Sequence, residues 1–145
     1  MEQLLALGAW RTLRNAKGER PVDIARRCGH TRLISILEPI LRHSVRPDAL
    51  RQLQEHFHSV IRGWAADLVR EHALRLPELE LLLELAVPKL WFPIPGMYGG
   101  FSVRLDHLLE SHVLVTESWC RVVDGSGERH IISPHGSLLI AEGFI

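Results

Sequence analysis

The chain has 145 residues, and its 17 Lys and Arg residues balance its 17 Asp and Glu residues. A neutral chain has no overall field that concentrates nucleic acid or an anionic membrane, so we expect neither as a partner. The longest apolar runs are well below the ~20 residues that a membrane-spanning helix needs. The two cysteines, Cys28 and Cys120, form no disulfide or zinc pattern, which predicts reduced thiols in a cytoplasmic protein without metal or cofactor.

The first readable pattern begins at Leu4 and ends at Leu37. Pro21 suits the first turn of a helix, because its missing N–H has no intrahelical partner there. Gly29 suits the left-handed end of that helix, and Thr31 is a candidate cap for the next one. The pattern therefore predicts two short helices joined by a tight turn.

This stretch resembles an ankyrin repeat. Arg20-Pro21-Val22-Asp23 stands where the family has Thr-Pro-Leu-His, and Ala25, Gly29-His30 and Ile36-Leu37 follow at the family's positions. Leu4-Leu5-Ala6-Leu7-Gly8-Ala9 is similar to the end of a preceding repeat. The resemblance covers one repeat and part of another, and it implies a scaffold that binds other proteins.

Arginine is frequent among the first fifty residues. Because ankyrin repeats bind proteins through their concave faces and Arg favours carboxylates, we expect Arg14, Arg20, Arg26 and Arg27 to contact an acidic protein partner. The alternative is an ordinary solvated surface. The leucines near the N-terminal edge, Leu4 among them, also predict self-association of the chain.

The longest helical pattern covers residues 47–72. Apolar residues recur there at spacings of three and four, among them Phe57 and Trp64. We expect this helix to pack on the ankyrin-like pair. After Pro77, a Leu-rich stretch at 78–86 predicts a second, buried helix.

From Lys89 onward, β-branched residues and turn signals predict an antiparallel sheet. We expect an edge strand at 90–94, strands at 101–105, 113–123, 129–133 and 138–145, and a loop or helical turn at 106–111. A hairpin turn is predicted at 124–127. Trp91-Phe92-Pro93, Gly96 to Phe101, Glu117-Ser118-Trp119 and Gly143-Phe144 resemble a tail of uncharacterised bacterial ankyrin-repeat proteins, which implies a bacterial origin.

The loop Gly96-Met97-Tyr98-Gly99-Gly100 is a candidate binding site. Its glycines allow a ligand to approach the main chain, and Met97 and Tyr98 are adaptable contact residues. The alternative is a plain turn between two strands. A phosphate cradle normally opens a helix, whereas a strand is expected here.

An enzyme is the rival class of function. Cys120 or Ser118 with His130, oriented by Glu117 or Asp124, is the set of residues that a nucleophilic mechanism requires. No catalytic signature surrounds either nucleophile, so we assign no catalytic residue. His56 and His58 diverge on their helix, so we assign no metal site either.

Together these observations predict an α+β protein in which an ankyrin-like helical half packs on a small C-terminal antiparallel sheet. Residues 1–46 form the ankyrin-like region, 47–87 the long helix and the Leu-rich helix, and 88–145 the β region. We expect a non-catalytic protein-binding module. The alternatives are a small hydrolase or transferase with its site near the hairpin at 113–133, and an immunity or antitoxin-like protein.

Overall fold

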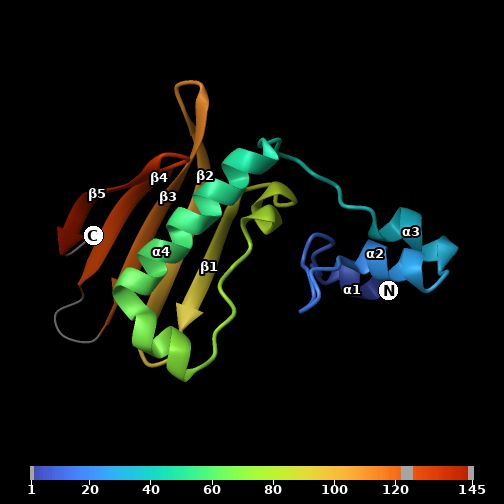
Figure 1. Ribbon diagram of the computed structural model, residues 1–145, viewed down its shortest axis with the longest axis horizontal. Helices are drawn as coiled ribbons and strands as arrows, with labels where there is room; N and C mark the ends of the chain where they lie inside the picture. Colours follow the sequence, from blue (N-terminus) through green and yellow to red (C-terminus); the bar gives the residue numbers. More distant parts are fainter. Residues whose placement is uncertain (1, 122–125, 144–145) are drawn as a thin grey trace.

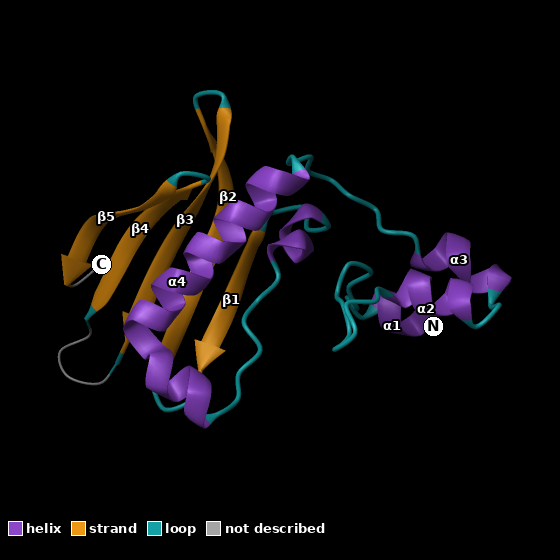
Figure 2. Cartoon of the chain, in the orientation of Figure 1, coloured by secondary structure: helices purple, strands orange, loops and turns teal. Residues whose placement is uncertain are grey.

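The computed structural model describes residues 2–121 and 126–143. It shows an α+β protein in which one long helix, α4, crosses one face of a five-stranded antiparallel sheet (Figure 1). The helices of the N-terminal part lie to the side of the sheet (Figure 2). Within the described part of the chain, no helix is long and apolar enough to cross a membrane.

The N-terminal segment, residues 2–46, holds the helices α1 (Glu2–Ala6), α2 (Pro21–Arg27) and α3 (Thr31–Leu37). The two predicted helices are present, and Pro21 takes the first helical position. The N–H of Arg20 donates to the Asp23 carboxylate at 3.0 Å, which secures the start of α2. Gly29 has φ 72°, so it supplies the left-handed turn between the helices.

Helix α4 (Pro47–Glu71) begins at the predicted proline. Its apolar stripe was expected to cover the N-terminal pair, and that expectation is wrong. Phe57 contacts Phe101 of the sheet edge to face, with ring centroids 6.5 Å apart. The sheet offers a broad row of buried apolar side chains, whereas α2 and α3 bury only three residues of their own, so the stripe buries more area on the sheet.

The Leu-rich stretch forms a short 3₁₀ helix, η1 (Leu79–Leu83), in place of the predicted helix at 78–86. Four of its leucines are nonetheless buried: Leu79, Leu81, Leu82 and Leu83. With leucine at most positions, the periodicity does not separate an α-helix from a tighter turn.

The strands are β1 (Lys89–Ile94), β2 (Gly99–Leu108), β3 (Ser111–Cys120), β4 (Gly127–Ser133) and β5 (Gly136–Gly143). Their order in the sheet follows their order in the chain, so the predicted strand at 90–94 does lie at an edge.

Three predicted limits in the β region differ from the structure or lie partly outside the described residues. The loop or helical turn expected at 106–111 is wrong, because β2 and β3 continue into a tight hairpin in which Leu109 has φ 55°. The last strand begins at Gly136, earlier than predicted. The predicted turn at 124–127 and the predicted end of the last strand fall partly outside the described residues.

Alternation along the strands gives the sheet two different faces. The inner face packs on α4 and is apolar, with Phe101 and Val103 fully buried. The α4 helix, η1 and the sheet share this one core, and we call them the body. The residues that alternate with these along each strand point to the outer face.

Candidate functional site: the open face of the sheet

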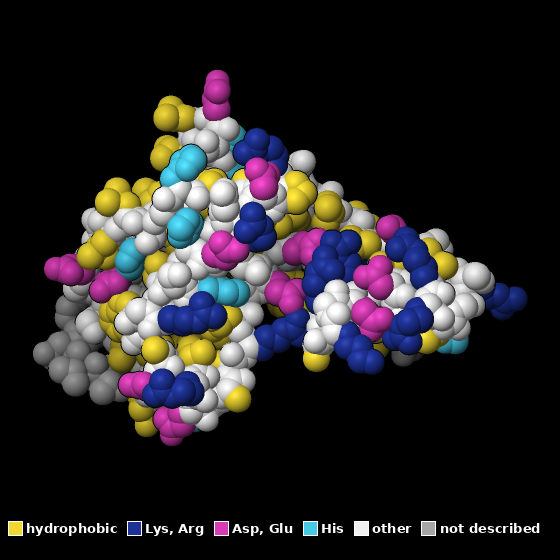
Figure 3. All heavy atoms as spheres, viewed as in Figure 1, with side chains coloured by type: hydrophobic (Ala, Val, Ile, Leu, Met, Phe, Trp, Pro, Cys, Tyr) yellow, Lys and Arg dark blue, Asp and Glu magenta, His cyan; other side chains and the backbone are white. Residues whose placement is uncertain are grey.

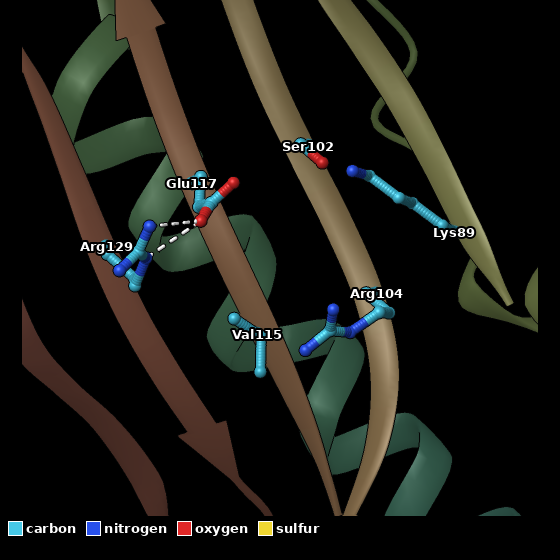
Figure 4. Close-up of a pocket in the computed structure, with 6 residues that line it drawn as sticks. All are labelled: Lys89, Ser102, Arg104, Val115, Glu117 and Arg129. Carbon is cyan, nitrogen blue, oxygen red and sulfur yellow. Dashed lines mark hydrogen bonds and ion pairs between the residues drawn. The ribbon is translucent and has the colours of Figure 1, made fainter. Parts of the chain in front are cut away.

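The face of the sheet that points away from α4 carries polar, charged and aromatic side chains, and we call it the open face. Figure 4 views part of it, with α4 behind the strands. It carries two partly exposed indoles on the strands that flank β2: Trp91, which is 50% exposed, and Trp119, which is 39% exposed. Tryptophan side chains are normally more buried than this, so their exposure on one face makes that face a candidate binding surface.

The strand register places the two indoles on either side of β2. Trp91 lies opposite Ser102, and Trp119 lies opposite Gly100. The two tryptophans stand on strands two spacings apart and are offset by two residues along them, so their backbones are separated by roughly 12 Å, with Ser102 and Gly100 of β2 between them. We call this depression the Trp trough; it has a volume of about 390 Å³.

Gly100, opposite Trp119 on β2, is a glycine for a packing reason. A Cβ atom at this position would lie 2.3 Å from the carbonyl oxygen of Phe92 and 2.8 Å from the Cα atom of Pro93, which are backbone atoms of β1 and do not move aside. A side chain is therefore excluded where β2 packs against β1.

A second depression adjoins the trough and shares Ser102 and Glu117 with it. It has a volume of about 320 Å³, and we call it the cationic cleft. Its lining comprises Lys89, Ser102, Arg104, Val115, Glu117 and Arg129 (Figure 4). Two guanidinium nitrogens of Arg129 contact the same oxygen of Glu117, at 2.7 and 2.8 Å, so this pair neutralises itself.

The remaining charges of the cleft are positive. Among the described residues, Lys89 has no ion pair. Arg104 bonds the carboxylate of Asp106 at 2.9 Å, but both side chains are about half exposed, so the pair is weak. The pKa of Asp106 is lowered mainly by the N–H of His107 and further by Arg104, so Asp106 stays ionised.

Arg121 adds a cation beside the Trp trough. Its guanidinium lies 4.8 Å from the ring centroid of Trp119, a distance at which a cation–π contact holds the indole in place. Within the described residues, the open face thus bears four cations (Lys89, Arg104, Arg121 and Arg129) against two carboxylates (Asp106 and Glu117). A chain with no net charge has a locally cationic surface here.

The predicted arginines of the N-terminal segment lie elsewhere, and all four have partners in the chain. Arg14 and Arg20 both pair with Glu80, which attaches the segment to η1. Arg26 pairs with Glu38 and Asp23, and Arg27 pairs with Glu19. Figure 3 shows basic and acidic side chains interspersed over this part of the molecule. This surface is therefore much less cationic than the sequence predicted.

The predicted glycine loop is divided between the core and the surface. Met97 is buried in the core, while Tyr98 is exposed with φ 51°. A Cβ at Gly99 would lie 1.7 Å from the carbonyl oxygen of Trp119. Gly99 and Gly100 thus have a packing reason in the sheet, independent of any ligand.

The residues of the rival catalytic set do not converge. Ser118 accepts the backbone N–H of Glu128 at 2.9 Å, and the Cys120 thiol donates to the Met97 carbonyl at 2.9 Å. Among the described residues, neither of these side chains bonds to His130. The ring of His130 lies 3.5 Å from the carboxylate of Glu128.

The two proposed orienting residues do not complete that set. Glu117 lies on the open face, on the opposite side of the sheet from Ser118, and Asp124 falls outside the described residues. His56 and His58 contact different carbonyl oxygens, those of Pro134 at 3.3 Å and Pro77 at 2.8 Å, so they do diverge.

Sequence reasoning missed the open face, although its signal is present in the strands. Charged and aromatic residues recur at every second position, as Lys89 and Trp91 do on β1 and Glu117 and Trp119 do on β3. That alternation indicates a common face only once the register between the strands is known.

In comparisons with known proteins, no family model, curated protein or solved structure matches this chain.

Proposed function

We propose that this protein is a non-catalytic protein-binding module and that the open face is its binding surface. The observation that carries the proposal is the pair of exposed indoles, Trp91 and Trp119, beside the cationic cleft. Tryptophan and arginine are the residues most enriched where binding energy concentrates in protein interfaces.

The shape of the site favours a polypeptide over a small molecule. Small-molecule pockets enclose most of their ligand's surface, whereas the two depressions of the open face lie side by side on the sheet and share Ser102 and Glu117. An extended segment follows such a surface and fills both depressions together. The nucleophiles, in contrast, lie on the inner face, where Ser118 accepts the N–H of Glu128 and the Cys120 thiol donates to the Met97 carbonyl, so we prefer binding to catalysis.

The N-terminal segment has a secondary place in this proposal. Its ankyrin character rests on the sequence motif alone. Arg26 and Arg27 are exposed and remain candidates for a second contact with the same partner. Self-association through Leu4 and Leu7, which are both exposed, also remains a proposal. Sedimentation of a Leu4→Glu variant tests it, because an unchanged sedimentation coefficient relative to the parent at high concentration contradicts it.

The test of the binding face uses three baits: the parent chain, the double variant Trp91→Ala/Trp119→Ala, and Leu109→Ala. Leu109 is the control because it is a large apolar residue, 89% exposed, at the tip of the β2–β3 hairpin and outside both depressions. We expect a partner that the parent and Leu109→Ala retain from native lysate and that the double variant loses. The partner is then purified, and its affinity is measured by calorimetry. Equal affinity of the parent and the double variant contradicts the proposal.

A further inference from the structure

Given the proposed binding function of the open face, on which this inference rests, we infer that the ligand is an extended, acidic segment of a partner protein. A carboxylate of that segment is held by Lys89 and Arg104. An apolar side chain two residues away lies in the Trp trough.

The cross-strand register supplies the first argument. Lys89 on β1 lies directly opposite Arg104 on β2 and on the same face of the sheet. Opposed residues of antiparallel strands have Cβ atoms roughly 5 Å apart, and like-charged side chains on such a pair are destabilising. Figure 4 shows the two side chains pointing apart, Lys89 toward Ser102 and Arg104 toward Val115. A carboxylate placed between them relieves the repulsion and receives charge-assisted hydrogen bonds from both.

The ion pairs of the face supply the second argument. Arg129 is already neutralised by Glu117, so it offers an incoming carboxylate less attraction. Lys89 has no ion pair among the described residues, and the partner of Arg104, Asp106, is itself about half exposed. The uncompensated positive charge of the cleft is therefore concentrated at the Lys89–Arg104 pair, which fixes where the anion binds.

The spacing along the strands supplies the third argument. Trp91 is two residues from Lys89 on β1, and Ser102 is two residues from Arg104 on β2. Two residues of a strand advance about 7 Å, and in an extended ligand the side chains at i and i+2 project to the same side. One ligand strand therefore reaches the trough and the cation pair with alternate side chains.

A single-stranded nucleic acid also combines anions with flat rings, and aromatic residues on a basic sheet do bind such strands. The ion pairs of the cleft argue against it here. Arg129 is neutralised by Glu117, so among the described residues the cleft offers uncompensated positive charge at Lys89 and Arg104 alone. That charge suits one carboxylate, whereas a chain of phosphates needs a positively charged groove that follows its whole length.

The experiment titrates ¹⁵N-labelled protein with short peptides and follows the indole N–H signals of its four tryptophans. The probe is Ser-Glu-Thr-Leu-Thr-Glu-Ser, blocked at both ends, in which Leu has Glu at i±2. Ser-Thr-Glu-Leu-Glu-Thr-Ser has the same composition with Glu at i±1, and two further peptides replace Glu of the probe by Gln or by Lys. The oligonucleotide (dT)8 is the fifth ligand.

We expect the probe to shift the signals of Trp91 and Trp119 and to bind at least about tenfold more tightly than the other four ligands. Lys89→Gln/Arg104→Gln should weaken the probe by a similar factor. Lys17→Gln/Arg32→Gln removes the same charge from exposed positions of the N-terminal segment and should leave affinity unchanged. Raising the salt concentration from about 50 to 300 mM should weaken binding.

Several outcomes overturn the inference. These are the absence of shifts at Trp91 and Trp119, equal binding of the two Glu peptides, and stronger binding of the Lys peptide or of (dT)8. The failure of the acidic-segment inference is distinguishable from failure of the binding proposal. A natural partner that depends on Trp91 and Trp119 but is indifferent to Lys89→Gln/Arg104→Gln leaves the binding face in place and removes only the acidic ligand.

Discussion

The body and the N-terminal segment of this protein are held together in different ways. The core of the body contains fifteen buried residues from α4, η1 and the sheet. The helices α2 and α3 bury only Val22, Ala25 and Leu37. Since the apolar area removed from water sets most of the folding free energy, the body is expected to be stable alone, whereas the segment depends on its attachment.

Two carboxylates attach the segment to the body: Glu80 of η1 and Glu84, which directly follows η1. Glu84 accepts the backbone N–H and the hydroxyl of Thr12, both at 2.5 Å, and the N–H of Arg11 at 3.2 Å. Glu80 pairs with Arg14 and Arg20. The comparison teaches that a few partly buried carboxylates position a segment whose own core is too small to do so.

The largest effect is expected in the core of the body. Phe57→Ala removes a fully buried ring that contacts Phe101, so it should lower the free energy of unfolding by about 3–5 kcal/mol. Denaturant titration followed by circular dichroism measures this loss. The control is Leu7→Ala, an exposed position. If both variants unfold at the parent's midpoint, α4 does not pack on the sheet.

The next effect should be confined to the segment. Leu37→Ala opens a cavity in the three-residue core and should destabilise α2 and α3 by about 2 kcal/mol or more. Hydrogen exchange should therefore accelerate in α2 and α3 and stay at the parent rate in β2 and β3. Equal acceleration in the strands would show that the segment and the body unfold as one unit and would contradict their separate stabilities.

The attachment itself is expected to contribute less. In the parent, three hydrogen bonds end on the charged oxygens of Glu84. Glu84→Gln keeps the shape of the side chain but removes its charge, so it should weaken these bonds at a cost of about 1–2 kcal/mol. Limited proteolysis should then cleave faster between Trp10 and Arg20, while the body melts as in the parent. Glu110→Gln, at the exposed tip of the β2–β3 hairpin, is the control. Unchanged cleavage would mean that Glu80 alone holds the segment.

The same contrast explains what the sequence predicted and what it missed. Local signals were sufficient for α4, where Pro47 and the apolar periodicity gave both limits within one residue, and for the strands with regular alternation. They failed where the answer depends on a distant partner. The stripe around Phe57 does not say whether it faces a helix pair or a sheet. Nor does the sequence show that a side chain at Gly100 would clash with the backbone of β1.

A pH change should act on the body through His58 of α4. Burial lowers the pKa of His58 below its usual 6.5, although its hydrogen bond to the carbonyl of Pro77 opposes the shift. Between the folded and unfolded pKa values the unfolded chain binds more protons, so stability falls as the pH drops through about 6.5.

Thermal unfolding at pH 7.5 and 5.5 measures this effect, and His58→Gln should reduce the difference between the two pH values. The pKa of His112 is also lowered, mainly by burial, so part of the difference should remain. His135, an exposed residue of the β4–β5 turn, is the control for substitution. A His58→Gln variant with the parent's full pH dependence would show that His58 is solvated.

A small effect on stability is expected for each indole of the open face, and it separates the two sides of the sheet. Trp91 and Trp119 are as large as any core residue, but each keeps 39–50% of its surface exposed, whereas Phe57 is fully buried. Each of the single variants Trp91→Ala and Trp119→Ala should therefore lower the free energy of unfolding by roughly 1–2 kcal/mol, which is less than Phe57→Ala although the side chain removed is larger. Denaturant titration of the three variants side by side measures this difference. A loss of 3 kcal/mol or more in either tryptophan variant would place the indole in a structural role and remove the reason to assign it to a partner.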